Sequence, residues 1–169
     1  MPASCSASIV TTFDKGRRFF AGVFAALLLA GCVAAPTVPI AYLSYQSDSS
    51  TRQRNLLVLL RGFGADNTIF DDEGIIDEIH DRQLPFDIIA PDTHFGYYQS
   101  KTIEDRLKHD IIDPARRQGY EQIWLAGFSM GGLGSLLYVR RYPDDIDGVL
   151  LSSPFLGRQS IHREIHRAG

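Results

Sequence analysis

Residues 122–134 restrict the possible folds of this chain more than any other stretch. An apolar run at 122–126, too short for a helix and containing Ile and Trp, leads directly into Gly127-Phe128-Ser129-Met130-Gly131. Leucines follow at helical spacing, at positions 133, 136 and 137. The pattern predicts a strand, a sharp turn and a helix, with Ser129 at the tip of the turn.

The two glycines of this turn favour a chemical role for the serine between them. Gly127 and Gly131 have no side chains, so the backbone at Ser129 is free to adopt a strained conformation. Such a turn raises the hydroxyl at the carboxyl end of the strand, above the free N–H groups and the positive dipole end of the helix. We therefore interpret Ser129 as a nucleophile. A phosphate-binding loop is the alternative, and it is disfavoured because no lysine follows the glycines.

Further apolar runs predict the rest of a sheet. Residues 55–61, 86–91 and 148–153 read as strands buried on both faces, and 41–46 as a short first strand with alternating character. Helical patterns cover residues 69–79 and 101–118. Because strands and helices alternate, we expect an α/β fold with three layers, in which helices cover both faces of a mostly parallel sheet.

Local signals predict where these helices begin, bend and end. Asp66 or Asn67 is expected to cap the first helix, which Gly74 interrupts. Pro114 should kink the second helix, and Gly119 should end it. The helix after Ser129 is expected to end before a proline at position 143.

The first 31 residues have the pattern of a signal peptide rather than of a folded domain. A basic region at 15–18 precedes an uncharged apolar run at 19–30, which is too short to span a bilayer as a helix. The run closes in Leu29-Ala30-Gly31-Cys32, which resembles a bacterial lipobox. This resemblance implies removal of residues 1–31 and lipidation of Cys32. Residues 32–40 would then form a tether, and residues 41–169 a single partial domain on an exported, membrane-anchored lipoprotein.

Composition excludes several other classes of protein. The formal net charge is −3 and no block of like charges occurs, so nothing favours binding to nucleic acid. The only cysteines are Cys5, inside the predicted signal peptide, and Cys32, so no disulfide is expected in the mature chain. No motif indicates a cofactor or a metal ion. Val33, directly after the lipobox, resembles lipoproteins sent on to an outer membrane.

Two motifs together resemble the α/β-hydrolase fold family. They are Arg61-Gly62-Phe63-Gly64, after a buried strand, and the Gly-x-Ser-x-Gly turn, and the resemblance extends from about residue 55 to residue 157. The family has His-Gly or a relative of it in the first loop, where this chain has Arg61. Since the backbone of that loop does the chemical work, the resemblance implies an oxyanion hole made of the N–H groups of Phe63 and Met130.

The resemblance also implies a catalytic acid and then a histidine, in that order after the serine, on loops that follow later strands. No carboxylate follows the strand at 148–153, and the chain has twelve residues after Gly157. We therefore expect a sheet without the family's last strands. The segment 158–169 contains His162, Glu164 and His166, which we interpret as a solvated helix face rather than as a triad or a metal site.

A second set of polar and aromatic residues follows the strand at 86–91. Asp92 and His94 are expected at the active-site edge of the sheet, because the carboxyl ends of parallel strands lie there. We expect them to shape a substrate cleft with Phe95, Tyr97 and Tyr98, rather than to serve as acid and base.

The sequence thus predicts a lipid-anchored serine hydrolase that acts on a small carboxylic ester or thioester. The alternative is a non-catalytic lipoprotein that uses the same fold for binding or as a scaffold. A sheet that ends at the strand at 148–153 would have an exposed edge, which predicts dimerisation or instability.

Overall fold

The computed structural model describes residues 34–47 and 54–157. The predicted signal peptide, Cys32 and the segment that contains His162, Glu164 and His166 lie outside the described residues. In the described part of the chain, no helix is long and apolar enough to cross a membrane.

A five-stranded sheet forms the centre of the fold, in the order β1-β3-β2-β4-β5. Four strands pair in parallel and β1 pairs antiparallel with β3, so the sheet is mostly parallel, as predicted. The strands are β1 (Tyr42–Tyr45), β2 (Asn55–Leu60), β3 (Asp87–Pro91), β4 (Gln122–Phe128) and β5 (Gly148–Ser152).

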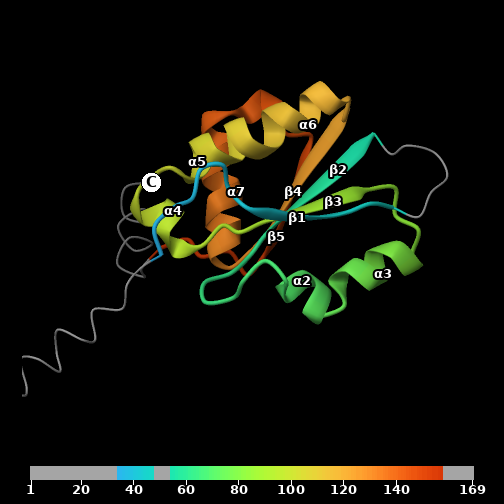
Figure 1. The fold of residues 1–169 in the computed structure, drawn as a ribbon, viewed down its shortest axis with the longest axis horizontal. Helices are drawn as coiled ribbons and strands as arrows, with labels where there is room; N and C mark the ends of the chain where they lie inside the picture. Colours follow the sequence, from blue (N-terminus) through green and yellow to red (C-terminus); the bar gives the residue numbers. More distant parts are fainter. Residues whose placement is uncertain (1–33, 48–53, 158–169) are drawn as a thin grey trace, which may run out of the picture. The chain divides into compact units, whose positions relative to one another are not determined.

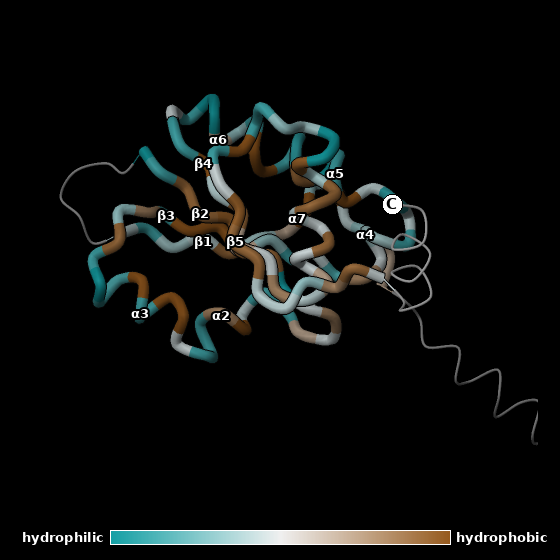
Figure 2. The backbone as a smooth tube through the Cα atoms, turned by 180° about the vertical axis from the view of Figure 1, so that it is seen from behind, coloured by the Kyte–Doolittle hydropathy of each residue, from teal (hydrophilic) through white to brown (hydrophobic). Residues whose placement is uncertain are grey.

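Strand β2 shows why the sheet needs helices on both faces. Its side chains alternate between two separate apolar clusters: Leu56, Val58 and Leu60 belong to one, and Leu57 and Leu59 to the other. Figure 2 shows the result, with β2 brown over most of its length and the outer turns of α3 and α6 teal. An unbroken apolar run is the expected sequence of a parallel strand that is covered on both sides.

Two groups of helices cover the sheet (Figure 1). On one face lie α2 (Ile69–Asp72) and α3 (Ile75–Asp81), which contribute Phe70, Ile76 and Ile79 to the core. The other face is covered by α4 (Phe95–Gln99), α5 (Ile103–Arg106), the π-helix η1 (Leu107–Ile112), α6 (Asp113–Gln118) and α7 (Met130–Arg141). The predicted three-layer architecture is confirmed.

The helix boundaries agree with the sequence signals at several points. Gly74 separates α2 from α3 with a positive φ of 69°, and Gly119 ends α6 with a φ of 94°. Pro143 begins the 3₁₀ helix η2 (Pro143–Asp145), directly after α7. At Pro114, the helix changes type. The proline lies in the first turn of α6, and the turns before it widen into η1, so the chain stays helical from α5 to α6.

The predicted cap of α2 is wrong in its details. Thr68 is the N-cap residue, and no side chain caps the helix there. Asp66 instead accepts hydrogen bonds from the N–H and the hydroxyl of Thr68, at 2.9 and 2.6 Å, in the turn before the helix. Asn67 donates from Nδ2 to the carbonyl oxygen of Ala90 on β3, at 3.2 Å. Both side chains therefore stabilise the β2–α2 loop instead of capping the helix. The N-cap lies one residue after Asn67 and two residues after Asp66.

Strand β5 lies at one edge of the sheet. Leu150 is 53% exposed and Leu151 is 42% exposed, although successive side chains of a strand point to opposite faces. In the described part of the chain, therefore, neither face of the sheet is fully covered at β5.

Candidate active site

Ser129 lies at the turn between β4 and α7, where the sequence predicts it. Its backbone has φ 51° and ψ −111°, a combination that a residue with a side chain rarely adopts. The residue is exposed to solvent, whereas the residues before and after it in the strand and helix are largely buried. The turn therefore presents the hydroxyl outward at the carboxyl end of the central parallel strands.

The glycines around Ser129 are required by close packing. A Cβ atom added to Gly131 would collide with the carbonyl oxygen of Leu60 on β2, and one added to Gly127 would lie 2.5 Å from the carbonyl oxygen of Gly131. The first turn of α7 therefore approaches the sheet more closely than any residue with a side chain allows.

Two backbone hydrogen bonds hold the turn against the end of β5 and the segment that follows it. The N–H of Ser129 donates to the carbonyl oxygen of Ser152 at 3.0 Å, which continues the β4–β5 ladder by one residue. The N–H of Phe155 donates back to the carbonyl oxygen of Ser129 at 2.8 Å. These bonds bring Phe155 next to the serine.

The N–H groups of Phe63 and Met130 both lie close to Ser129. Met130 is the first residue of α7, so its N–H has no acceptor within the helix. Phe63 lies in the β2–α2 loop beside the turn: a Cβ atom added to the preceding Gly62 would lie 3.5 Å from Cβ of Ser129. Neither N–H donates to a backbone acceptor among the residues that the structure describes.

A pocket of about 230 Å³ opens at Ser129. No charged side chain lines it, and its lining residues come from four separate parts of the chain: Phe63, Phe95, Tyr98, Ser129, Met130, Leu133 and Phe155. The rings of Phe63 and Phe95 meet edge to face, with centroids 5.6 Å apart. Because Phe63 is still 69% exposed, this aromatic pair forms an open rim rather than a closed wall.

Comparisons with known proteins agree with this geometry. A family model described as serine aminopeptidase, S33, matches residues 100–168, and no curated protein matches the chain. Among solved structures, a monoacylglycerol lipase from Paleococcus ferrophilus is 22% identical with a TM-score of 0.52, over 76% of this chain and 50% of its own. Est1E from Butyrivibrio proteoclasticus, solved with ferulic acid bound, is 19% identical with a TM-score of 0.56, over 77% and 53%. An esterase from Exiguobacterium antarcticum is 17% identical with a TM-score of 0.52, over 75% and 49%.

The chain has an α/β-hydrolase fold. It spans about half the length of the solved structures that it matches.

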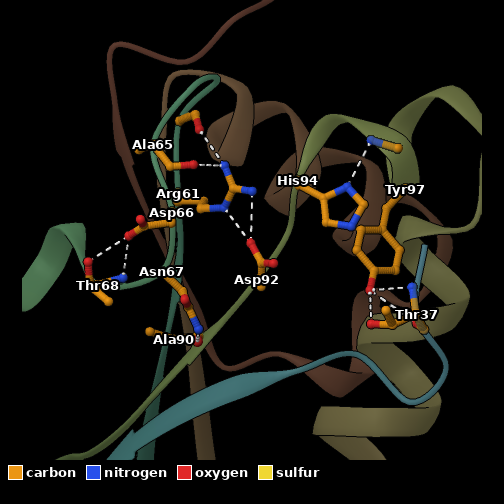
Figure 3. A network of polar contacts seen from close by, with 12 residues as sticks. Thr37, Arg61, Ala65, Asp66, Asn67, Thr68, Ala90, Asp92, His94 and Tyr97 are labelled. Atoms are coloured by element: carbon orange, nitrogen blue, oxygen red, sulfur yellow. Dashed lines mark hydrogen bonds and ion pairs between the residues drawn. The ribbon is translucent and has the colours of Figure 1, made fainter. Parts of the chain in front are cut away.

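In this α/β-hydrolase fold, the side chain of Arg61 forms a hydrogen-bond network with the β2–α2 loop and Asp92. The guanidinium is only 6% exposed and donates from Nε and Nη2 to the same Asp92 oxygen, Oδ1, at 2.9 and 2.8 Å. Its Nη1 donates to the carbonyl oxygens of Ala65 and, at 3.4 Å, of Gly62 (Figure 3). The expectation that only the backbone of this loop matters is therefore incomplete.

The predicted cleft residues after β3 divide into two groups. Phe95 and Tyr98 line the pocket, as expected. Asp92, His94 and Tyr97 do not line it, contrary to the expectation, because each is engaged elsewhere. Asp92 pairs with Arg61, and His94 accepts from the N–H of Gly96 through Nδ1, at 3.1 Å, as the N-cap of α4.

Tyr97 is buried on the far side of α4 from the pocket lining. Its hydroxyl bonds to Thr37, 60 positions earlier in the chain, through both the backbone N–H at 3.1 Å and the side-chain oxygen at 3.0 Å. Its ring packs against that of His94, with centroids 4.5 Å apart. The residue thus anchors the segment before β1, and Figure 3 shows this contact beside the Arg61 network.

Tyr98 has an unusual environment at the inner end of the pocket. Its hydroxyl is buried beside Thr93 without a hydrogen bond of good geometry among the described residues, and it contacts α7 at Gly134. Burial raises the pKa of Tyr98 well above its ordinary value of 10.0, so the phenol stays protonated across the physiological range. Tyr98 is therefore a neutral wall of the pocket and no base.

Leu133 and Phe155 line the pocket but were missed by the sequence interpretation. Leu133 lies one helical turn after Ser129, and this spacing could have predicted that the two side chains share one side of the helix. Phe155 follows β5, and only the backbone bond to Ser129 places it at the site.

None of the histidines in the described ranges, His80, His94 and His109, lines the pocket with Ser129. In the same ranges, no group of three His, Cys, Asp or Glu side chains is arranged to hold a metal ion. The described residues thus bring together a candidate nucleophile and two candidate oxyanion donors, with no histidine among the residues that line the pocket.

Proposed function

We propose that this protein is a serine hydrolase that cleaves carboxylic esters or thioesters, with Ser129 as the nucleophile. The observation that carries the proposal is an exposed serine with a φ of 51°, on a turn that opens into an apolar pocket beside two backbone N–H groups. Two structures with a similar fold are named a monoacylglycerol lipase and an esterase, which supports an ester substrate.

In the proposed reaction, Oγ of Ser129 loses its proton to a base and forms a bond to the carbonyl carbon of the substrate. The carbonyl oxygen becomes an oxyanion, which accepts hydrogen bonds from the N–H groups of Phe63 and Met130. The tetrahedral intermediate then collapses: the bond to the leaving oxygen or sulfur breaks, and the base returns its proton so that the alcohol or thiol departs. The acyl group stays on Ser129 until water attacks it, which releases the carboxylic acid and the free serine. Loss of one oxyanion donor typically costs about 3 kcal/mol of transition-state stabilisation.

The pocket lining favours an uncharged, apolar group next to the reacting carbonyl. Aromatic and aliphatic side chains surround the space, and burying a charged substrate group there without a partner would be costly. We propose short esters and thioesters with apolar acyl groups as the substrates.

We also propose that Cys32 carries a lipid that anchors the protein to a bacterial membrane after export. Support for this proposal comes from the sequence of residues 1–33, which lie outside the described ranges. In this arrangement, residues 32–40 link the anchor to the sheet.

The hydrolase proposal is tested with p-nitrophenyl esters of increasing acyl length, with the wild-type protein, Ser129→Ala and the control Ser100→Ala. Ser100 is an exposed serine after α4 and does not line the pocket. We expect turnover in the wild type and the control and at least a ~100-fold loss in Ser129→Ala. Equal turnover in the wild type and Ser129→Ala would contradict the proposal.

A binding or scaffold domain without catalysis is the second candidate. It is favoured by one observation: among the described residues, no histidine lies at the pocket beside Ser129. A protein that binds apolar esters without hydrolysing them, with the same affinity in the wild type and in Ser129→Ala, would support this candidate instead.

A further inference from the structure

We infer that Arg61 is a positioning residue for the oxyanion hole, because it orients the peptide group that carries the N–H of Phe63. The inference rests on the proposed hydrolase function. It goes beyond that proposal by assigning a catalytic contribution to a buried side chain that does not line the pocket.

Acceptors from two separate segments surround the guanidinium of Arg61. Three of its nitrogens donate to three different oxygens, two of which are backbone carbonyls of the β2–α2 loop: Gly62, at 3.4 Å, and Ala65. The third acceptor is the carboxylate of Asp92, directly after β3. Figure 3 shows the guanidinium between the loop and Asp92.

The planar peptide bond between Gly62 and Phe63 couples the direction of its C=O to the direction of its N–H. In a trans peptide the C=O and the N–H point in opposite directions within one plane. Because the Gly62 carbonyl points toward Nη1 of Arg61, the N–H of Phe63 points away from the guanidinium. The bond to Arg61 therefore selects one of the two orientations of this peptide plane.

The sheet holds Arg61 and its partner Asp92 in place. Arg61 directly follows β2, and Asp92 directly follows its parallel neighbour β3. A second bond across the same two segments joins Nδ2 of Asn67 to the carbonyl oxygen of Ala90, at 3.2 Å. Hydrogen bonds thus hold the loop at both ends. The orientation of the peptide group between Gly62 and Phe63 therefore does not depend on packing of the Phe63 side chain, which is 69% exposed.

Lysine cannot replace arginine in this role. One ammonium group is a single point of donation, whereas the rigid guanidinium reaches the carboxylate and the carbonyls on separate nitrogens. The substitution Arg61→Lys would keep a positive charge opposite Asp92 and lose the fixed direction of the Gly62 carbonyl. The variant therefore separates charge from orientation.

The test compares wild type, Arg61→Lys and Asp92→Asn with the matched control Arg82→Lys. The control side chain is 68% exposed and pairs with Glu78 on the surface of α3. Each protein is assayed for kcat and KM on p-nitrophenyl acetate, for the inhibition constant of a trifluoromethyl ketone, and for its melting temperature. The ketone forms a tetrahedral adduct whose oxyanion requires the same donors as the transition state.

We expect Arg61→Lys to lower kcat by about 10–100-fold with KM within about 3-fold, and to weaken the ketone by the same factor as kcat. Asp92→Asn keeps an oxygen acceptor for Arg61, so its kcat should fall by less, about 3–10-fold. Arg82→Lys should match the wild type in every measurement.

Two failures are distinguishable. No Ser129-dependent turnover in the wild type would overturn the proposed function and this inference with it. Ser129-dependent turnover with wild-type kcat in Arg61→Lys would overturn the inference about Arg61 alone. If Arg61→Lys is unfolded by its melting curve, Asp92→Asn decides: wild-type kcat and ketone affinity in that folded variant would also overturn it.

Discussion

Ser129 is held in a backbone conformation that its side chain disfavours. Its φ of 51° is positive, and its ψ of −111° lies outside the left-handed helical region in which the occasional non-glycine residue is found. Such conformations cost on the order of 1–3 kcal/mol and persist only where the surrounding structure enforces them. Here the enforcing contacts are the close packing at the glycines 127 and 131 and the backbone bonds to Ser152 and Phe155.

This strain predicts that two substitutions of Ser129 differ in stability. Ser129→Gly removes the steric cost, so we expect it to be more stable than Ser129→Ala by about 1 kcal/mol after the added chain entropy of glycine. Chemical denaturation of both variants measures the difference in free energy of unfolding. A Ser129→Gly protein that is less stable than Ser129→Ala would show that the turn is not strained.

At the level of single residues, the sequence predicted local geometry better than long-range pairing. The turn at Ser129 was predictable because its glycines, strand and helix are adjacent in the chain. The side-chain role of Arg61 was not, because its partner Asp92 is 31 positions away. A hydrogen bond over that separation leaves no periodic signal, and an aspartate after a strand equally suits a cleft wall.

Among the elements, α7 packs through glycines in its first turns, although Tyr138 further along the helix is fully buried in the core. Its buried positions include Gly131, Gly132 and Gly134, whereas Leu136 is exposed. The leucine spacing therefore predicted the helix correctly but not the face that contacts the sheet. Close backbone approach replaces side-chain packing in the first turns, and a hydrophobic pattern cannot report it.

Strands β4 and β5 are joined at their amino ends by Asp147. The carboxylate accepts from the N–H of Ile123 at 2.8 Å and from Nη2 of Arg116 at 3.0 Å. These two bonds, the backbone bond first, hold the pKa of Asp147 below its ordinary value of 3.8, although partial burial opposes them. A carboxyl whose pKa is lowered on folding stabilises the fold above its unfolded pKa, and this contribution is lost as the pH falls.

We therefore expect Asp147→Ala to lower the free energy of unfolding by about 1 kcal/mol at pH 7. The difference from the wild type should shrink as the pH falls from about 3.8 through the lower pKa of the folded state, because the wild-type carboxylate becomes protonated over that range. Denaturation curves at pH 7 and pH 3 measure it. Asp81→Ala, at an exposed carboxylate on α3, serves as the control and should show a small difference at both pH values. A difference for Asp147→Ala that does not depend on pH would contradict this account.

Over the whole molecule, the mostly parallel direction of the strands followed from the sequence, since alternating buried strands and helices favour a parallel sheet. The order of the strands, β1-β3-β2-β4-β5, was not predicted. The predicted first strand at 41–46 forms β1, and its antiparallel pairing with β3 was not predictable from its length or pattern. The predicted exposed edge is found at β5, where the described residues leave Leu150 and Leu151 accessible. Whether this edge causes association remains a prediction.

We expect the protein to self-associate through the β5 edge, because a strand edge with exposed leucines on both faces is a template for pairing. The double substitution Leu150→Lys with Leu151→Lys should shift the protein toward the monomer in sedimentation velocity. Leu84→Lys is the matched control, because Leu84 is 41% exposed and lies away from this edge, and it should leave association unchanged. A wild-type protein that sediments as a monomer at all concentrations would contradict the prediction.

The proposed function depends on the turn between β4 and α7, which is proposed to make Ser129 a nucleophile. The most direct measurement is labelling of the wild type and Ser129→Ala with an alkyl fluorophosphonate, followed by intact-protein mass and peptide mapping. If Ser129 is the nucleophile, we expect one phosphonyl group per wild-type chain, attached to Oγ of Ser129 with loss of fluoride. We expect no adduct in Ser129→Ala. No adduct in the wild type, or an adduct that survives the substitution, would contradict this role of Ser129.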